Sequence, residues 1–450
     1  MVFFRLPTEQ MYDKIEAPNN RSQSIRKEYP GMEIDYEQLP DNKILCVDMR
    51  SFFASVEAVE RGWDPLEVCL AVVGDKSRPG SVVLAASPAL KEKYNIKTGS
   101  RLYEIPEKKE IKIVEARMGL YLQRSLQITL LFREFVPLDA IHVYSIDESW
   151  IKLAGTERLY GEDKLKVAGM IKERIEKEFS LPCSMGIGPN MFLAKVAMDI
   201  EGKKKGLVEW TYADVKEKLW PVPVEKCWGI GRRMSRWFKK IGVNTVGDIA
   251  RLPLEFLEDR FGIMGNQLYY HAWGVDLSKL EGHYNDPRKA IGRGITLFKD
   301  YNDVEEIKTV IFDLAEEVGK RARDSNLVGK TVILGIGYSK REKQAGFHLQ
   351  RTGEAYTNLT GDIYRLALEL FMENYRGQAV RKVSLALGNL TTATDLQLNL
   401  FIDQSKEIKL ARIKDRLENK YGYKALFFGK SLRPGSVRER IKTTIGGHGS

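Results

Sequence analysis

Cysteine and histidine are scarce in this sequence, which limits the metal and redox chemistry open to it. Its 450 residues include four cysteines and five histidines. The cysteines lie far apart and have none of the paired spacings that zinc sites and disulfide frameworks use. We therefore expect neither a zinc site nor a disulfide among Cys46, Cys69, Cys183 and Cys227.

Long hydrophobic runs are also missing. No stretch approaches the roughly eighteen uninterrupted apolar residues that a transmembrane helix needs. The sequence begins with Arg5, Glu9, Asp13 and Lys14 where a signal peptide would have its apolar region. We therefore expect a cytoplasmic protein with no membrane partner, and we interpret residues 1–40 as an N-terminal extension.

Positive charge, by contrast, is in excess. The net charge is +10, whereas hydrophobic residues at 43% and charged residues at 29% are typical of globular proteins. The length predicts roughly three domains. Such an excess is common in proteins that bind nucleic acid or an anionic membrane surface, although large basic proteins without a polyanionic partner also exist.

Two adjacent carboxylates interrupt the apolar segment HVYSIDESWIKL, residues 142–153. The runs on both sides predict strands, so Asp147 and Glu148 lie at the tip of a hairpin. The pair is either a soluble polar turn or a site for a divalent metal ion. A third carboxylate, Asp48, ends a predicted buried strand over residues 44–47, where it either joins the pair or caps the helix that starts near Ser51.

The order of the predicted elements favours the metal site. From residue 44 to residue 187 the pattern is strand, helix, strand, strand, helix, strand, which is the ferredoxin-like β-α-β-β-α-β arrangement. In that sheet the first strand lies beside the hairpin, so we expect Asp48 to lie against Asp147 and Glu148. The predicted fold class is α+β multidomain, with this domain at the centre.

Lysines accompany one further helix start and one loop that follows a helix. In a predicted α/β insertion, Ser87 begins a helix with Lys91 near its first turns, an arrangement that receives phosphate oxygens. Exposed lysines without a ligand are the commoner alternative. Lys203 opens a run of three lysines that either binds a triphosphate or a DNA backbone, or is a solvated loop.

A G-I-G turn marks a separate small helical domain. Gly229, Ile230 and Gly231 match the helix-hairpin-helix form, in which backbone N–H groups approach a phosphate without side-chain obstruction. Arg232 and Arg233 follow directly, and residues 216–245 hold eight basic and two acidic residues. This combination predicts binding of a DNA backbone.

A second β-α-β-β-α-β pattern covers residues 290–390. Lys340, Arg341, Arg351 and Arg381 lie in or beside its strands. The sheet is therefore expected to rest against phosphates, unless the charged edges serve only to prevent aggregation.

The last fifty residues form a predicted tail. Residues 402–450 hold twelve basic and five acidic residues, and the amphipathic stretch within them places Leu410, Ile413 and Leu417 on one face. Just before the tail, the segment QLNLF combines polar and apolar anchors that either enter a partner's pocket or cover the chain's own core. Its candidate partner-binding residues are Gln397, Leu398, Leu400 and Phe401.

Four strings, taken in order, carry a family resemblance: LCVDMRSFFASVEA, SVVLAASPALKEKYNIKTGSRLYEI, YSIDESWIKL and GIGPNMFLAKVAMD. Together with the G-I-G turn and QLNLF, they resemble the Y-family translesion DNA polymerases, most of all the UmuC-like group of Gram-positive bacteria. The implied organisation is an extension (1–40), palm (41–62 and 116–215), fingers (63–115), thumb (216–284), second β-α-β-β-α-β domain or little finger (285–392), and clamp-binding motif with basic tail (393–450).

The resemblance implies a template-directed, error-prone DNA polymerase. Such an enzyme adds dNTPs to a primer 3′-OH, bypasses DNA damage and lacks proofreading. Two Mg²⁺ ions, replaceable by Mn²⁺, are the implied cofactors of nucleotidyl transfer. The implied metal ligands are Asp48, Asp147 and Glu148, with the carbonyl of Met49 as an additional oxygen.

Contacts with the incoming nucleotide are implied in the same way. Phe53 aligns with the steric gate, an aromatic ring that leaves no room for a 2′-OH. The sequence has GKKKG where many relatives have a proline-containing turn, and SPALKEK where many have a Tyr and an Arg. The implied nucleotide-binding residues are Ser51, Phe52, Phe53, Ser87, Lys91 and Lys203, with Lys204 and Lys205 as alternatives to the last.

The implied partners are primed template DNA, dNTP, a sliding clamp bound through QLNLF, and other proteins of the SOS damage response. Two alternatives belong to other classes. A non-catalytic DNA-binding or clamp-binding protein would not need three carboxylates. Another palm enzyme, such as a nucleotide cyclase, would have no use for the G-I-G turn and the second basic sheet.

Overall fold

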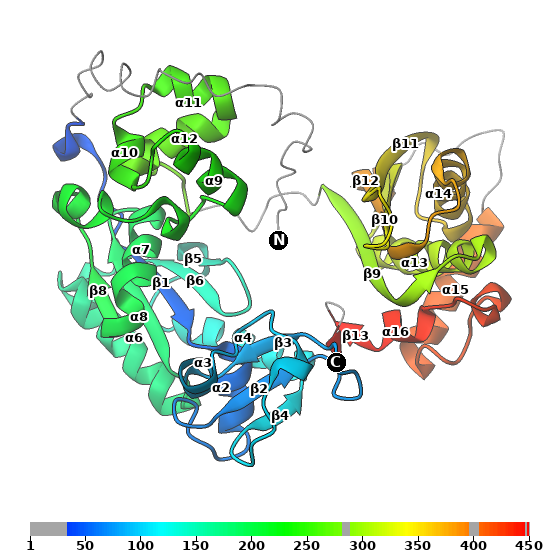
Figure 1. The fold of residues 1–450 in the computed structure, drawn as a ribbon, viewed down its shortest axis with the longest axis horizontal. Coiled ribbons are helices and arrows are strands. Elements are labelled where there is room, and N and C mark those ends of the chain that lie inside the picture. Colours follow the sequence, from blue (N-terminus) through cyan, green and yellow to red (C-terminus); the bar gives the residue numbers. More distant parts are fainter. Residues whose placement is uncertain (1–33, 281–288, 396–404, 446–447, 450) are drawn as a thin grey trace. The chain divides into compact units, whose positions relative to one another are not determined.

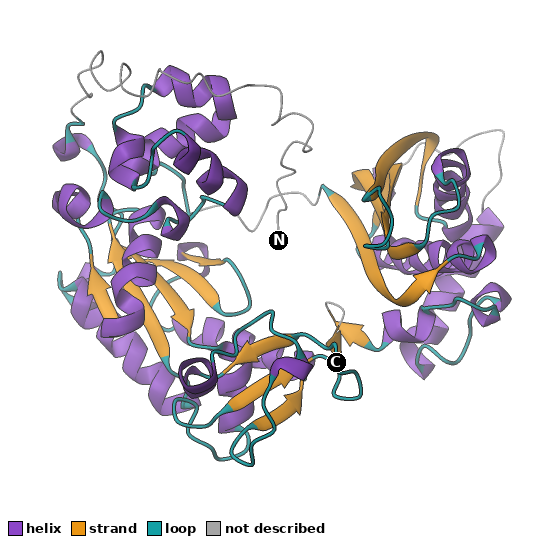
Figure 2. Cartoon of the chain, in the orientation of Figure 1, coloured by secondary structure: helices purple, strands orange, loops and turns teal. Residues whose placement is uncertain are grey.

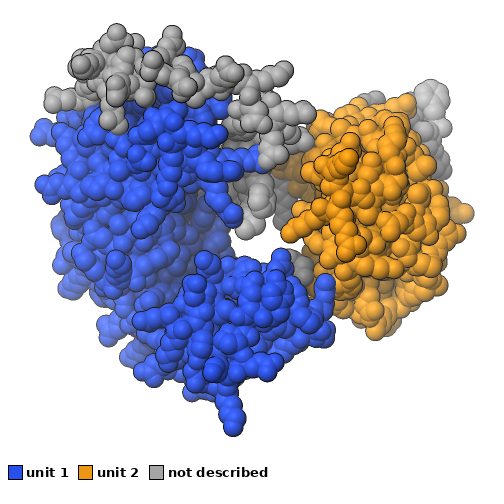
Figure 3. Space-filling model, viewed as in Figure 1, with its two compact units in different colours: residues 1–285 blue, residues 286–450 orange. Residues whose placement is uncertain are grey.

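The structure, a computed structural model, describes residues 34–280, 289–395, 405–445 and 448–449 (Figure 1). The chain divides into two compact units, residues 1–285 and residues 286–450, drawn in blue and orange in Figure 3. Both units mix helices with sheets, as Figure 2 shows, which confirms the predicted α+β class. Within the described ranges, none of the helices has the length and hydrophobicity that a bilayer crossing requires.

The first unit is built on a five-stranded sheet with the order β5-β6-β1-β7-β8. Strand β1 (Ile44–Met49) lies in the middle and pairs antiparallel with both β6 and β7. The first strand therefore lies beside the hairpin, as the ferredoxin-like pattern predicted. The other strands are β5 (Ile141–Val143), β6 (Glu148–Lys152), β7 (Cys183–Gly188) and β8 (Leu207–Glu209).

Alternation along β1 sends its side chains to two different cores. Leu45 and Val47 are buried in a cluster with residues of the helices α2, α4 and α6. Ile44 and Cys46 are buried on the other face, against residues of α7. These helices are α2 (Phe52–Val59), α4 (Met118–Phe132), α6 (Lys164–Phe179) and α7 (Met191–Ala197), and a short α5 (Glu157–Tyr160) precedes α6.

Helix α7 lies very close to the sheet. A Cβ at Gly186 of β7 would collide with backbone atoms of Ala194 and Met198, so only glycine permits this approach. The helix continues into η5 (Met198–Gly202), one turn of π-helix, and then into α8 (Lys203–Lys205). The close approach therefore holds a continuous helical segment over the face of β1 that carries Asp48.

The region expected to form the fingers is a three-stranded sheet with the order β3-β2-β4. Strand β2 pairs antiparallel with β3 and parallel with β4. Helix α3 follows β3 directly, with Ser87 as its N-cap and Pro88 in its first turn. The elements are β2 (Leu70–Val73), β3 (Val83–Ala86), α3 (Pro88–Tyr94) and β4 (Lys112–Glu115).

The region expected to form the thumb is helical and has a core of its own. Buried residues such as Phe238, Val246 and Leu257 pack together with residues of α7. Its helices are α9 (Arg232–Lys240), α10 (Val246–Ala250), α11 (Leu254–Phe261) and α12 (Ile263–Ala272). Single helical turns elsewhere in this unit are η2 (Tyr36–Gln38), η3 (Leu102–Glu104), η4 (Leu138–Ala140), η6 (Tyr212–Asp214), η7 (Val215–Leu219) and η8 (Val224–Lys226).

The second unit contains an antiparallel four-stranded sheet with the order β11-β10-β12-β9. Val332, Leu334 and Ile336 of β10 alternate along the strand and are buried in one cluster with residues of α13 and α14. The element order is the predicted β-α-β-β-α-β, but the last strand here separates the first two. The elements are β9 (Ala290–Tyr301), α13 (Val304–Asp324), β10 (Leu327–Tyr338), β11 (Gly346–Thr357), α14 (Thr360–Asn374) and β12 (Val380–Thr392).

Residues 405–445, which we call the C-terminal segment, are folded onto this unit rather than extending as a tail. Val437 and Ile441 join the core between the sheet and α13. Its elements are α15 (Ser405–Tyr421), η11 (Gly429–Leu432), α16 (Arg438–Lys442) and β13 (Thr444–Ile445), which pairs with β14 (His448–Gly449); η10 (Ala393–Asp395) precedes the segment.

Candidate active site

The carboxylates gather where β1 meets the hairpin. Asp48 and Glu148 are directly paired positions on the antiparallel strands β1 and β6. The backbone N–H of Met49 donates to the carbonyl of Asp147 at 2.9 Å, which ties the hairpin tip to the end of β1. The structure thus brings the predicted third carboxylate to the pair, because paired residues on adjacent strands have neighbouring Cβ atoms.

A buried lysine compensates the charge of Glu148. Lys195 of α7 contacts Oε1 of Glu148 at 3.0 Å and Oδ2 of Asp199 at 3.2 Å. Asp199 also accepts from Lys203 at 2.6 Å. The sequence analysis missed Lys195 and Asp199. The available signal was the alternation of charge at Lys195, Asp199 and Lys203, which are four residues apart and share one helix face.

Burial dominates the electrostatics of the carboxylates. It raises the pKa of Asp48 to about 6; the charges of Lys203 and Lys195 oppose this shift, whereas those of Asp147 and Glu148 add to it. Burial likewise raises the pKa of Glu148, against the opposing charge of Lys195. The three acids therefore lie close enough to repel one another, and their ionised forms favour an added cation.

The donor set fits Mg²⁺, although the carboxylates do not yet converge. Asp147 accepts a hydrogen bond from the hydroxyl of Ser145 at 2.6 Å, while Glu148 is held by Lys195. Within the described residues, the Asp48 carboxylate has no hydrogen-bond partner, and no three His, Cys, Asp or Glu side chains are grouped to hold a metal ion. A mostly buried carboxylate without a hydrogen-bond partner, beside two other carboxylates, offers oxygen donors of the kind that Mg²⁺ prefers.

Two lysines from different helices lie near Asp48: Lys91 of α3 and Lys203 of α8. Lys91 of α3 donates to the hydroxyl of Ser51 at 2.7 Å, and Ser51 has a left-handed backbone with φ 50°. Loss of solvation lowers the pKa of Lys91, and the charges of Lys203 and Arg50 lower it further. Lys91, Lys203 and Arg50 therefore form one positive cluster beside the acids, suited to phosphate oxygens.

Two other residues predicted to contact phosphate, Ser87 and Lys205, already have partners within the protein. Ser87 is fully buried, and its hydroxyl accepts from Leu70 N at 2.9 Å and donates to Val68 O at 2.5 Å. This placement is unfavourable to a direct contact with a nucleotide, because the hydroxyl already has its partners. Of the two alternatives to Lys203, Lys205 pairs with Glu201 at 2.6 Å.

Phe53 lies on a rigid aromatic support. Its half-buried ring stacks on the ring of Tyr121 in α4, with centroids 4.4 Å apart and planes inclined by 13°. The Tyr121 hydroxyl donates to Glu57 at 2.7 Å, and Arg117 donates to the same carboxylate at 2.8 and 2.9 Å. Phe52, in contrast, is a core residue with 2% of its surface exposed.

The predicted G-I-G turn leads directly into a helix. Gly229 has φ 90°, Ile230 is buried, and Gly231 is the N-cap of α9. A Cβ at Gly229 or Gly231 would meet only open space, so the backbone is accessible from outside. Arg232 and Arg233 lie exposed in the first turn of α9.

The basic residues predicted for the second sheet differ in availability. Lys340 and Arg341 are exposed in the turn after β10. Arg351 pairs with Glu369 at 3.0 Å and with Glu373 at 2.6 Å, both on α14. Arg381 pairs with Asp300 at 3.3 Å. The clamp-motif residues Gln397, Leu398, Leu400 and Phe401, like most of the predicted extension 1–40, lie outside the described residues.

A ferredoxin-like sheet with acids at the β1–hairpin edge and cations opposite them defines the palm of a nucleotide-polymerising enzyme. Family models agree with this class along most of the chain. Residues 47–199 match the impB/mucB/samB family, and residues 288–400 match its C-terminal domain. Residues 212–243 match the helix-hairpin-helix motif of the same family, and residues 228–276 match a DNA polymerase-iota thumb domain.

Individual relatives narrow the class. UvrX of Bacillus subtilis (strain 168), whose name describes UV-damage repair, is 49% identical over 421 residues, which cover 93% of this chain and 100% of the relative. DNA polymerase IV 2 of the same organism is 36% identical, covering 91% and 99%. DNA polymerase IV of Moorella thermoacetica (strain ATCC 39073 / JCM 9320) is 37% identical, covering 88% and 98%.

A solved structure agrees in fold. A Y-family DNA polymerase chimera of Dbh and Dpo4 superposes with a TM-score of 0.64 at 21% identity, covering 78% of this chain and 99% of that one. The chain belongs to the Y-family translesion DNA polymerases and is a DNA-directed DNA polymerase. The predicted family and fold, with palm, helix-hairpin-helix thumb and little finger, are confirmed.

Proposed function

We propose that this polymerase extends a primer by two-metal nucleotidyl transfer at Asp48, Asp147 and Glu148, without proofreading. The observation that carries the proposal is the direct pairing of Asp48 with Glu148 across β1 and β6, beside a cluster of cations. Two Mg²⁺ ions supply activation of the primer 3′-OH and neutralisation of the triphosphate when they are bound. The residues that would hold these ions are the three acids, through their carboxylates, and Met49, through its carbonyl.

Lys195 holds Glu148 in place in the metal-free protein. Its second partner, Asp199, lies 3.2 Å from the same ammonium, so Lys195 would keep an ion pair if Glu148 were to hold a metal ion instead. This exchange avoids an unpaired buried cation, which would be strongly unfavourable.

In this proposal the nucleotide lies between α2 and the two helices that carry cations, which are α3 with Lys91 and α8 with Lys203. Lys203 and Lys91 bind phosphate oxygens, because both ammonium groups lie near Asp48. The charge of Lys203 opposes the rise in the pKa of Asp48 that burial causes, and the charge of Asp48 opposes the fall in the pKa of Lys91 that burial causes. Phe53 bars a ribose 2′-OH, since Tyr121 behind its ring prevents it from receding.

Template and primer DNA bind through the exposed backbone at Gly229 and Gly231 and through exposed cations such as Arg232, Lys340 and Arg341. We extend the proposal to docking on a sliding clamp through QLNLF. The same proposal places the enzyme in the cytoplasm, in a damage-induced response that copies lesions with low accuracy.

Primer extension tests this function. Purified protein, a primed template, dNTPs and Mg²⁺ should give template-directed addition, and Asp147→Asn should reduce it by at least about a hundredfold, since charge stabilisation in the transition state is lost. Asp139→Asn, at an exposed acid of the same unit, is the matched control and should keep full activity. A DNA-binding protein without catalysis would add no nucleotide, and unchanged addition by Asp147→Asn would refute the site.

A further inference from the structure

Helix α15 of the C-terminal segment buries a charged face, whereas its sequence pattern suggests that it would bury the apolar one. Two large apolar residues of α15 point outward, with Leu410 57% and Ile413 43% exposed. The buried residues of this helix are Lys414, Asp415 and Glu418, all of them charged. The helix is therefore attached to the little finger by ion pairs rather than by an apolar stripe.

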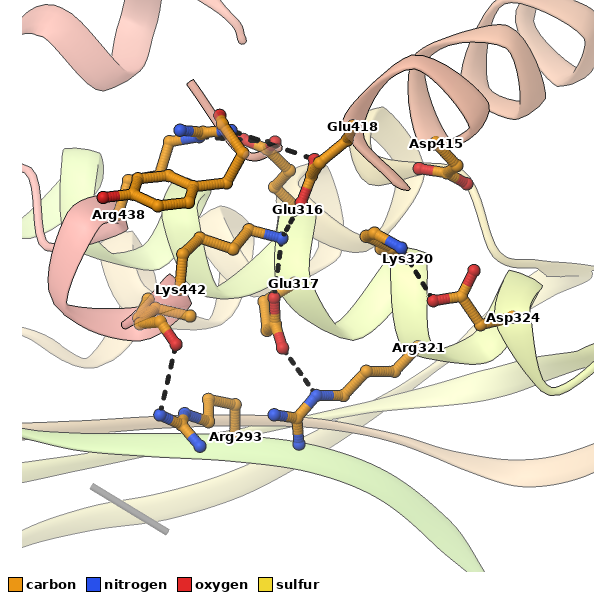
Figure 4. A network of polar contacts seen from close by, with 12 residues as sticks. Arg293, Glu316, Glu317, Lys320, Arg321, Asp324, Asp415, Glu418, Arg438 and Lys442 are labelled. Atoms are coloured by element: carbon orange, nitrogen blue, oxygen red, sulfur yellow. Dashed lines mark hydrogen bonds and ion pairs between the residues drawn. The ribbon is translucent and has the colours of Figure 1, made fainter. Parts of the chain in front are cut away.

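These ion pairs form a network around α13, which Figure 4 shows with Lys442 between Glu418 and Glu317. Lys442 contacts Glu418 at 2.6 Å and Glu317 at 2.9 Å. Lys414 of α15 contacts Glu316 of α13 at 2.5 Å and Glu418 at 3.2 Å.

A second connection fixes the rotation of α15 about its own axis. Asp415 accepts two hydrogen bonds from the guanidinium of Arg323, at 2.6 and 3.1 Å. Turning the helix would leave Asp415 and its neighbours buried without partners, which is strongly unfavourable. The direction in which the opposite face points is therefore determined by the fold.

That opposite face carries a row of four cations, which we call the α15 stripe: Lys409, Arg412, Arg416 and Lys420. Spacings of three, four and four residues place them along one side of the helix. All four are exposed, and within the described part of the chain none has an ion-pair partner. At 1.5 Å rise per residue the stripe is about 16 Å long.

We propose that the α15 stripe is a further DNA-binding site, which contacts backbone phosphates independently of sequence. Duplex DNA carries one negative charge per roughly 1.7 Å, so a stripe of this length faces several phosphates at once. The inference rests on the DNA polymerase function, which brings DNA to the protein. It adds a contact beyond residues 288–400, where the C-terminal family match ends.

The stripe suits DNA better than an anionic membrane. A helix that lies in a bilayer surface presents a continuous apolar face beside its cations. The apolar row beside the stripe, Leu410, Ile413 and Leu417, covers about two helical turns, whereas the cations extend over about three, and Leu417 is only partly exposed. An anionic membrane is nevertheless a separate outcome that the experiment distinguishes.

The test measures binding of the full-length chain to a fluorescent primed duplex between 50 and 200 mM salt, without dNTPs. The variant carries K409Q, R412Q, R416Q and K420Q. Each lost phosphate contact lowers the slope of log K against log salt by about 0.9, so loss of two to four contacts lowers it by about 1.8 to 3.6. A stripe that binds DNA should give weaker binding and this shallower slope.

Two control variants distinguish an effect of the α15 stripe from an effect of the protein's total positive charge. K108Q, K109Q, K166Q and K177Q remove the same charge from exposed lysines of the other unit and should leave the slope nearly unchanged. K409R, R412K, R416K and K420R keep the charge and should keep the binding. Equal losses in both glutamine variants, or an unchanged slope in the stripe variant, would overturn the proposal.

Two further measurements complete the design. Circular dichroism should give the same unfolding curve for the stripe variant and the parent, because the buried network is untouched.

If phosphatidylserine vesicles bind the parent but not the stripe variant, while DNA binding is unaltered, the stripe is a membrane site and the proposal is wrong. Primer extension at saturating enzyme should proceed at the parent rate in the stripe variant, whereas failure of the parent itself would refute the polymerase function instead.

Discussion

Asp48→Asn should stabilise the metal-free protein while abolishing its activity. The pKa of Asp48 is about 6 in the folded state against 3.8 for an ordinary aspartate, chiefly because of burial. Between these two values the folded state binds the proton that the unfolded state has released, so rising pH destabilises the fold. Each pKa unit corresponds to about 1.36 kcal/mol, and the penalty above pH 6 is therefore about 3 kcal/mol.

Asparagine removes the ionisable group and hence this penalty. The gain in the free energy of unfolding should approach about 3 kcal/mol at pH 7.5 and be small at pH 4, where folded Asp48 is protonated. At saturating Mg²⁺ the parent should instead have the higher free energy of unfolding. Binding of Mg²⁺ to the ionised carboxylates stabilises the parent by mass action and stabilises the Asp48→Asn variant much less.

Urea unfolding followed by tryptophan fluorescence measures this difference. All seven tryptophans lie between residues 63 and 273, so their emission reports on the unit that contains Asp48 and not on the other. Asp139→Asn removes the same charge from an exposed position and should change stability by no more than about 0.5 kcal/mol. A stability of Asp48→Asn equal to or below that of the parent, in EDTA at pH 7.5, would refute the reasoning.

Two other predictions concern specificity and partners. Phe53→Ala should raise ribonucleotide incorporation at least tenfold relative to dNTP, because the ring supported by Tyr121 is removed, and an unchanged rNTP to dNTP ratio in single-nucleotide extension would remove the gate assignment. Replacing Leu400 and Phe401 by Ala should weaken binding to a sliding clamp by at least tenfold in surface plasmon resonance while unassisted primer extension continues, and unaltered clamp affinity would return QLNLF to a structural role.

The backbone of the candidate site was predictable, because strand alternation and element order depend on local sequence. The buried strand ending at Asp48 and the hairpin at Asp147 and Glu148 fix which strands must pair. Helix α4 did not emerge in the same way, and Tyr121 therefore remained unassigned. Its stacking on Phe53 joins residues 68 positions apart, a contact that depends on packing rather than on any local pattern.

The orientation of α15 could not be predicted for a different physical reason. Hydrophobic periodicity assumes that a helix buries its apolar face. This rule fails where the neighbouring helix already carries buried charges, because Glu316 and Arg323 of α13 require Lys414 and Asp415 as partners more strongly than Leu410 requires burial. A sequence pattern cannot reveal that requirement, since it arises only when α13 and α15 are side by side.

The same principle connects Lys195 with the three acids that we propose as metal ligands. A site that must ionise three carboxylates in a partly buried place is destabilised until a cation arrives. Lys195 neutralises Glu148 but leaves Asp48 without a partner among the described residues, so the compensation is incomplete. We infer that this incompleteness is functional. A second lysine paired with Asp48 would stabilise the empty site, but under the proposed mechanism it would compete with a metal ion for the Asp48 carboxylate.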